Sequence, residues 1–169
     1  MADPTHIVRT GGTDWSKVWR GRHPFNATSE MQLVPLGGPT GMKRVGASLI
    51  RIPPGKESFI PHAHTLSEEF AFVLEGRGEV VLDGEAHPIG PGDFVGFPTD
   101  GVVHSVRSVG PGDLVYLTAG EHTAGIEVAD MPSIGKTTVF RNGRMELYDT
   151  ASAEVLTTEQ WMARTRIEE

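Results

Sequence analysis

Histidines and carboxylates stand close together in one short part of the chain. His62 and His64 are separated by one residue, and the carboxylates Glu68 and Glu69 follow a few positions later. Side chains two apart on a β-strand point to the same face, so a strand here projects both imidazoles to one side. A third histidine, His104, begins a later apolar stretch. This set predicts a site for one divalent transition metal ion, with Fe, Mn, Zn, Ni and Co all compatible.

The alternation of side chains does not choose between the two carboxylates. Glu68 and Glu69 point to opposite faces of a strand, and apolar residues occupy both faces in the run from 70 to 74. Either face can line an interior. Three histidines and one carboxylate leave coordination positions for water or substrate, so the set also predicts Lewis-acid chemistry on an oxygen-rich molecule.

The residues around this set read as many short strands. Between about 37 and 120, apolar stretches alternate with glycine and proline turns, including Asp83-Gly84 and the repeated Gly-Pro-Gly-Asp at 90–93 and 110–113. Asp-Gly between two apolar runs is a two-residue hairpin signal. No helical pattern long enough for a parallel crossover occurs there, so the region is expected to form an all-β sandwich or barrel.

The flanking segments predict further strands and one helix. An N-terminal strand is expected over residues 31–36. Asn142-Gly143 lies between two apolar runs and is the strongest hairpin signal in the chain. Thr157 with Gln160 three residues later is typical of a capping box, which predicts a helix over residues 158–165.

Composition indicates an ordinary globular chain. Its 169 residues suit one domain, and 38% of them are hydrophobic and 22% charged. The net charge of −7 disfavours nucleic acid as a partner, because phosphate binding needs a basic surface. The absence of cysteine excludes disulfides, thiolate metal sites and a cysteine nucleophile. No apolar leader or membrane-length apolar run occurs, so a cytoplasmic protein without a membrane partner is expected.

At these positions the sequence resembles the cupin superfamily. The first motif of that family is Gly, five residues, His-x-His, three or four residues, Glu, six residues, Gly. Here Gly55, His62, His64, Glu69 and Gly76 follow in the same order, with gaps of six, four and six residues. The resemblance, through the gap before Gly76, selects Glu69 as the carboxylate ligand.

The second cupin motif is Gly, five residues, Pro-x-Gly, two residues, His, three residues, Asn. The chain matches it with Gly92, Pro98, Gly101 and His104, although one extra residue lies between Pro98 and Gly101 and Ser108 replaces the asparagine. The resemblance therefore assigns His104 as the third histidine ligand.

The resemblance covers about residues 45–119 and implies a double-stranded β-helix, or jelly-roll barrel, with a metal inside one mouth. It implies a small single-domain bacterial cupin spanning residues 1–169. The N-terminal extension (1–44) would add strands, and the C-terminal extension (120–169) would add a hairpin and a short helix. Proteins of this kind commonly form homodimers, so a homodimer is expected as well.

Two functions are compatible with this set of residues. The first is a metal-dependent enzyme of isomerase, lyase or dioxygenase type that acts on a small oxygen-rich molecule. Arg51 and Tyr116, on barrel strands, are candidates for orienting its substrate, and no proton-transfer residue is assigned. The alternative is a non-catalytic module that binds a sugar or organic acid, with the metal as an anchor or absent. No site role is assigned to His6, His23 or His87, and His122 is expected in a loop, with a role in a pocket as the less favoured alternative.

Overall fold

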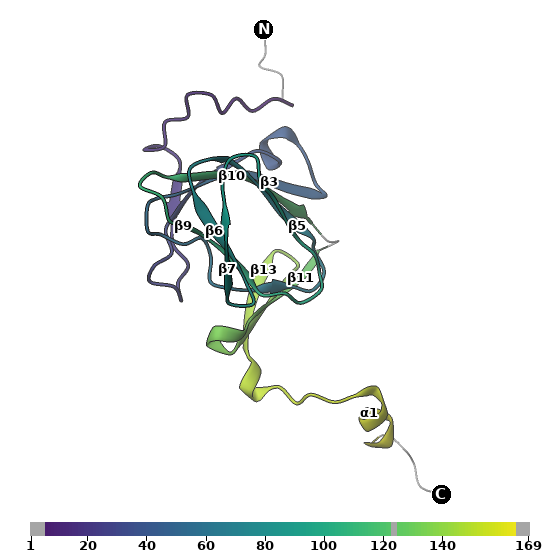
Figure 1. Ribbon diagram of the computed structural model, residues 1–169. Helices are drawn as coiled ribbons and strands as arrows, with labels where there is room; N and C mark the ends of the chain where they lie inside the picture. Colours follow the sequence, from purple (N-terminus) through teal and green to yellow (C-terminus); the bar gives the residue numbers. More distant parts are fainter. Residues whose placement is uncertain (1–5, 123–124, 165–169) are drawn as a thin grey trace, which may run out of the picture.

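A computed structural model describes residues 6–122 and 125–164. Its described elements are mostly strands, which form sheets of six, four and three strands. Figure 1 shows the strands arranged as a barrel. An arm, residues 150–164, leads away from it and ends in the helix α1 (Thr158–Arg164). The all-β fold predicted from the spacing of turns is therefore confirmed.

The six-stranded sheet joins segments that lie far apart in the sequence. Its strands, in spatial order, are β1 (Trp19–Gly21), β2 (Met31–Pro35), β3 (Val45–Ile52), β10 (Leu114–Glu121), β5 (Glu69–Glu75) and β8 (Phe94–Phe97). All neighbours are antiparallel, and β10 pairs with both β3 and β5. Strands distant in sequence thus become neighbours, which is the crossover pattern of a jelly roll.

The three-stranded sheet forms the opposite wall of the barrel core. Its strands, in order, are β7 (Glu85–Ile89), β6 (Gly78–Leu82) and β9 (His104–Ser108). Asp83 and Gly84 connect β6 to β7 with φ values of 48° and 87°. Both values lie in the left-handed region that a two-residue hairpin turn requires, as the Asp-Gly pair predicts.

The hydrophobic core receives side chains from both of these sheets. Met31, Ile52 and Val73 are fully buried. On β5, Ala71 and Val73 point inward, and because side chains alternate along a strand, Glu69 shares their inner face. The structure thereby answers a question that the alternation pattern alone leaves open. The buried cluster contains Met31, Ile50, Ile52, Ala71, Val73, Val80, Ile89, Phe97, Val106, Leu114 and Tyr116.

A four-stranded sheet covers the mouth of the barrel that carries the histidines. Its strands, in order, are β13 (Arg144–Asp149), β12 (Lys136–Arg141), β11 (Ile126–Met131) and β4 (Ala63–His64). Asn142 and Gly143 turn β12 into β13 with φ values of 52° and 71°, as predicted. Strand β11 has no counterpart in the sequence prediction. It pairs with β4, placing Ala129 opposite His64.

Short helices complete the described chain. Three 3₁₀ turns are formed by η1 (Gly38–Thr40), η2 (Pro132–Ile134) and η3 (Thr150–Ser152). The helix α1 begins after Thr157, whose hydroxyl accepts a hydrogen bond from the Gln160 amide at 3.1 Å, while the Gln160 side chain accepts one from the Thr157 amide at 2.8 Å. This is the predicted capping box. Residue 165, the last of the predicted helix, lies outside the described residues.

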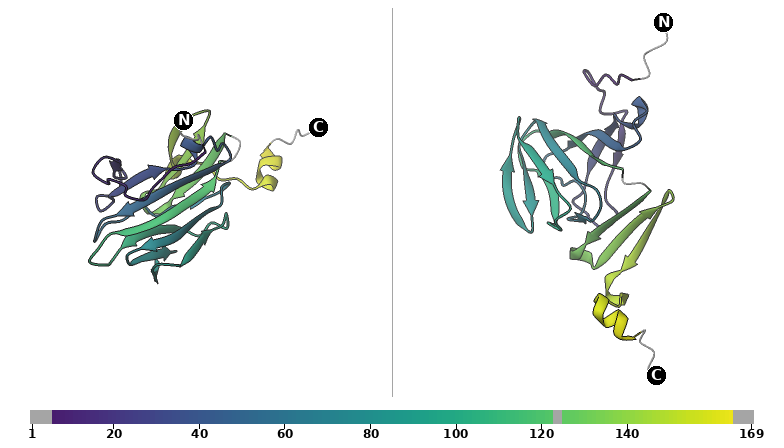
Figure 2. Two further views of the ribbon diagram at one scale, coloured as in Figure 1. Left: turned by 90° about the horizontal axis from the view of Figure 1, so that it is seen from above. Right: turned by 90° about the vertical axis from the view of Figure 1, so that its right-hand side faces the viewer.

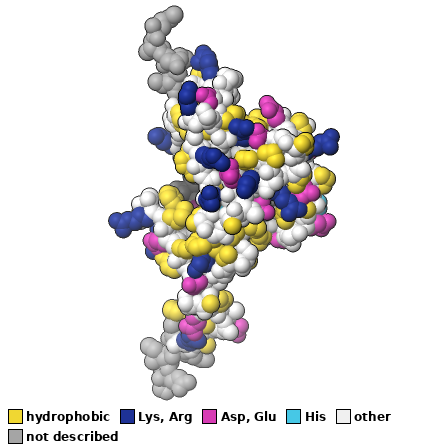
Figure 3. Space-filling view, turned by 90° about the vertical axis from the view of Figure 1, so that its left-hand side faces the viewer, with side chains coloured by type: hydrophobic (Ala, Val, Ile, Leu, Met, Phe, Trp, Pro, Cys, Tyr) yellow, Lys and Arg dark blue, Asp and Glu magenta, His cyan; other side chains and the backbone are white. Residues whose placement is uncertain are grey.

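Charged and hydrophobic side chains are distributed differently over the barrel and near the arm. Figure 2 shows α1 extending away from the strands. Figure 3 shows Lys and Arg side chains dispersed over the barrel face, with hydrophobic side chains gathered between the barrel and the arm. Within the part of the chain that the structure describes, no helix combines the length and apolar content needed to cross a membrane.

Candidate metal centre

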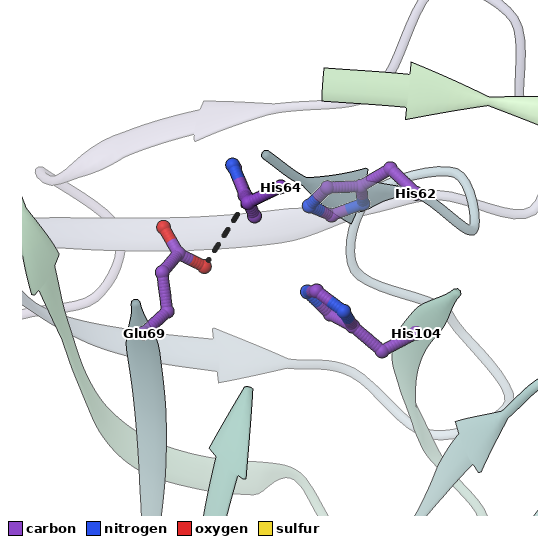
Figure 4. Close-up of side chains that lie close together, drawn as sticks. All are labelled: His62, His64, Glu69 and His104. Atoms are coloured by element: carbon purple, nitrogen blue, oxygen red, sulfur yellow. Dashed lines mark ion pairs between the residues drawn. The ribbon is translucent and has the colours of Figure 1, made fainter. Parts of the chain in front are cut away.

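Each of the four predicted ligands lies at or beside the beginning of a strand, and the strands belong to three different sheets. His64 lies on β4, Glu69 begins β5 and His104 begins β9. His62 precedes β4 and exchanges backbone hydrogen bonds with His104, at 3.1 and 2.8 Å. The four residues therefore come together only where the three sheets meet (Figure 4).

The distances between the four side chains suit one ion. One donor atom from each residue can be chosen so that all of them lie within 4.8 Å of one another. The ring centroids of His62 and His104 are 4.7 Å apart, and those of His62 and His64 are 4.9 Å apart. In Figure 4 the Glu69 carboxylate faces the three rings, with Oε2 3.5 Å from Nε2 of His64.

Contacts on the far side of each ring determine which nitrogen carries the proton. The Nδ1 atom of His62 lies 2.7 Å from the carbonyl oxygen of Ile60, and Nδ1 of His104 lies 3.2 Å from that of Val102. A carbonyl oxygen only accepts hydrogen bonds, so both Nδ1 atoms are protonated. Both Nε2 atoms therefore present lone pairs, the form in which neutral imidazole binds a metal.

Strand β11 supplies a comparable contact for His64. Its Nδ1 atom lies 3.4 Å from Oε1 of Glu127. A carboxylate behind a histidine orients the ring and makes it a more basic ligand.

Two nitrogens of the cluster give a test of whether a metal fits. Nε2 of His64 and Nε2 of His104 are buried, and neither has a hydrogen-bond partner among the described residues. Buried polar atoms are nearly always paired, because an unpaired one costs free energy. A metal ion would accept both lone pairs. The donor set of three imidazoles and one carboxylate therefore fits a divalent transition metal.

Burial sets the protonation of the metal-free cluster. Burial, together with the neighbouring His104, lowers the pKa of His62 to about 3. Burial also lowers the pKa of His104 and raises the pKa of the Glu69 carboxyl. His62 and His104 are therefore neutral at pH 7, as metal ligation requires.

A cavity of about 750 Å³ opens above the four residues. It is the size of a typical small-molecule site, and its wall includes all four residues together with Tyr116. Burial raises the pKa of Tyr116, so its phenol stays protonated at neutral pH. The cavity gives a small molecule direct access to the candidate ligands.

A protein-family model and several known proteins are similar to this chain. The family model described as "Cupin domain" matches residues 48–120. The crystal structure of a putative sugar phosphate isomerase from Acidithiobacillus ferrooxidans is 33% identical and superposes with a TM-score of 0.83, covering 90% of this chain and 97% of that one. The chain belongs to the cupin superfamily.

Three further relatives resemble parts or most of this cupin. A sugar phosphate isomerase of the cupin superfamily from Silicibacter pomeroyi is 25% identical, with a TM-score of 0.73 over 87% of this chain and 97% of that one. The polyketide synthase CurC from Streptomyces cyaneus is 40% identical over 77 residues, which are 46% of each chain. The match covers 54% of a second curated relative, an uncharacterized protein from Methanocaldococcus jannaschii. The cupin therefore spans about half the length of the curated relatives that it matches.

The structure separates the two residues predicted to orient a substrate. Tyr116 lines the cavity of this cupin. Arg51 does not: its guanidinium forms an ion pair with Asp113 and lies 5.5 Å from the centre of the Trp15 ring. Because β3 directs the Arg51 side chain toward Asp113 and Trp15, the structure does not place Arg51 where a molecule above the cluster would contact it.

The cavity of this cupin also contains residues that the sequence did not predict as site residues. Glu127, His23 and His122 all line it. The ring of His23 packs edge-on against Phe59, at 6.2 Å between centroids. None of the three has a distinctive spacing. A carboxylate in the alternating run from 126 to 131 is the one signal that could have indicated Glu127.

Proposed function

We propose that this cupin binds one divalent transition metal ion through His62, His64, Glu69 and His104. The convergence of four donor groups within 4.8 Å carries the proposal. Hydrogen bonds from Nδ1 of His62 and His104 support it, because they leave the Nε2 lone pairs available to a metal. Which of Fe, Mn, Zn, Ni and Co is bound stays open.

We further propose that the protein is an enzyme acting on a small oxygen-rich molecule, with isomerase, lyase or dioxygenase chemistry. A bound metal would supply Lewis acidity toward a carbonyl or enolate oxygen. The fold of the chain positions the three imidazoles and the Glu69 carboxylate that would bind the metal. The Tyr116 phenol holds its proton beside the cavity. The names of the relatives suggest two substrate classes, sugar phosphates and polyketides.

Non-catalytic binding of a small molecule is the second candidate function. The carboxylate of Glu127 faces Nδ1 of His64 and lies 3.5 Å from the Leu66 amide nitrogen, and Glu69 belongs to the donor set. Both carboxylates nearest the rings are therefore occupied, and neither is an obvious base for proton transfer. This observation favours a binding module.

The metal content of protein purified without added metal tests the proposed site. We expect about one ion per chain in the wild type and almost none in His62→Ala/His64→Ala, since two of four ligands are lost. The control His87→Ala/His122→Ala removes two histidines outside the donor set and should retain the metal. Circular dichroism checks that each variant is folded. Equal metal in the wild type and in His62→Ala/His64→Ala would refute the site.

A second measurement separates the two functions. An enzyme should convert a member of a panel of hydroxy acids, diketones and sugars, and the conversion should stop when a chelator removes the metal. A binding module should be stabilised by a ligand against thermal unfolding without converting it.

We also propose that the protein is a homodimer. Apolar side chains are exposed on β13 and the arm, with Leu147 44% and Val155 88% accessible. Exposed apolar surface of this kind is typical of protein interfaces. The cytoplasmic location and the lack of a nucleic-acid partner stay predictions from composition.

A further inference from the structure

The walls of the cavity above the four donor residues are mainly apolar. The accessible parts of the wall include the exposed side chains of Phe59, Phe140 and Met145. Further inside, aliphatic and aromatic side chains continue the same surface. This inner apolar lining includes Ile50, Val106 and Met131. A surface of this kind favours a ligand that has apolar area to bury.

The cavity lacks the groups that normally bind phosphate. None of the described residues lining it is Lys or Arg. Arg51, Arg107 and Arg141 each pair with a carboxylate outside the cavity. The described α-helix, α1, lies on the arm and is not part of the cavity wall, so no helix N-terminus of the described chain faces a ligand there. A phosphate group would find no guanidinium or ammonium partner on these walls.

The charges that do line the cavity are of the wrong sign for a phosphate. Three carboxylates, Glu69, Glu121 and Glu127, belong to the lining. Even where Glu69 is neutralised by a metal, the other two remain beside the space that a ligand would fill. Like charges repel at such distances, so the walls disfavour a dianionic group.

The donor residues lie deeper in the cavity than part of its apolar wall. The donor residues and Tyr116 are buried or half-buried, whereas Phe140 and Met145 reach the surface. A ligand whose oxygens point inward would therefore place its remaining atoms against the apolar wall.

We infer that the natural ligand is an unphosphorylated molecule with a pair of neighbouring oxygens at one end and an aromatic or similarly apolar body. This inference rests on the proposed function, since the oxygens would face the metal centre. It selects against phosphorylated sugars as substrates of this chain. Specificity would come from the apolar wall around Phe59, Phe140 and Met145.

Two diketones that differ in one substituent test the apolar wall. Pentane-2,4-dione and 1-phenylbutane-1,3-dione carry the same pair of oxygens, but the second has a phenyl group in place of a methyl group. Isothermal titration calorimetry on metal-loaded protein should show that the phenyl compound binds at least about tenfold more tightly, because the ring buries more apolar area. Equal affinities would overturn the inference.

A sugar pair tests the exclusion of phosphate. Fructose 6-phosphate should bind no more tightly than fructose, since the walls offer the phosphate no cation. Binding of the phosphate ester about tenfold or more tighter than fructose would overturn the inference.

Two substitutions test whether the proposed apolar wall causes the preference for the phenyl compound. Phe140→Ala and Met145→Ala should weaken binding of the phenyl compound and leave pentane-2,4-dione almost unchanged. Phe94→Ala is the matched control, because Phe94 is an exposed aromatic residue outside this cavity and should not alter the ratio of the two affinities. An unchanged ratio in both cavity variants would contradict the assigned wall.

The same samples distinguish failure of this inference from failure of the proposed function. Their metal content tests the metal centre, and the ratio of the two diketone affinities tests the wall. A protein that takes up no metal but keeps the phenyl preference would overturn the metal centre and support the wall. A metal-loaded protein whose two diketone affinities are nearly equal would support the metal centre and overturn the wall.

Discussion

At the residue scale, the centre depends on contacts made by the ring nitrogens that face away from it. Backbone carbonyls hold Nδ1 of His62 and His104, whereas His64 relies on the Glu127 side chain. Carbonyl oxygens are part of the fold and cannot be altered by substitution. The orientation of His64 therefore depends on a single side chain from the neighbouring strand β11, and His64 is the ligand most open to adjustment.

Acid should destabilise the metal-free protein because of the buried imidazole of His62. Burial holds its pKa near 3 in the folded chain, whereas the ordinary value is 6.5. Between these values the unfolded chain binds a proton that the folded chain does not bind, so the free energy of unfolding decreases as pH falls from about 6.5. We expect His62→Gln to lose less stability than the wild type between pH 7 and pH 5, as measured by urea denaturation in the presence of a chelator.

His87→Gln is the control for this measurement, because His87 lies on β7 outside the cavity. It should follow the wild-type pH profile. Parallel profiles for wild type and His62→Gln would show that His62 does not cause the loss of stability.

At the scale of elements, the centre requires close approach between strands. Gly120 on β10 is paired with Glu69 on β5. A Cβ atom at Gly120 would lie 2.6 Å from Cγ and 3.1 Å from Oε1 of Glu69. The absence of a side chain at Gly120 therefore leaves space for the Glu69 carboxylate on the inner side of the sheet.

Gly120→Ala should displace the Glu69 carboxylate while leaving the barrel folded. The clash involves the side chain of Glu69, which can move, so we expect a metal affinity about tenfold lower rather than loss of the fold. Competition with a chromophoric chelator measures the affinity.

Gly96→Ala on β8 is the matched control for this substitution. Its Cβ would have an ordinary contact of 3.7 Å with Phe94, so the metal affinity should not change. Equal affinities for both variants would argue against a role for Gly120 in positioning Glu69.

At the scale of the whole molecule, the C-terminal arm leaves apolar surface exposed. Leu147 on β13 and Val155 on the arm are 44% and 88% accessible. In Figure 2 the arm extends from the strands, where a second copy could reach it. Burial of such side chains between two copies would stabilise the proposed homodimer.

Sedimentation equilibrium tests the homodimer. The wild type should sediment as a dimer, and Leu147→Asp/Val155→Asp should shift it toward monomer, because a charged group in an apolar interface is costly to desolvate. Val109→Asp is the control, since Val109 is an exposed apolar residue in the loop that follows β9 and is not part of the arm. A monomeric wild type would refute the proposal.

The sequence alone determined the features that depend on local geometry. The Asp83-Gly84 and Asn142-Gly143 turns require positive φ at neighbouring positions, and both were predicted from residue type. The cap of α1 depends on residues three apart, and it too was predicted. The four candidate ligands followed from spacing and from the resemblance to cupins, and the structure brings them together.

Tertiary structure alone decided which other side chains surround that group. Glu127 is 63 residues from His64 in sequence, and the two meet because β11 pairs with β4. His23 enters the same cavity from the N-terminal segment, while Arg51 turns toward Asp113. Such contacts depend on which strands become neighbours. Spacing along one strand predicts which side chains share a face, but it does not predict what the opposite face of the cavity presents to them.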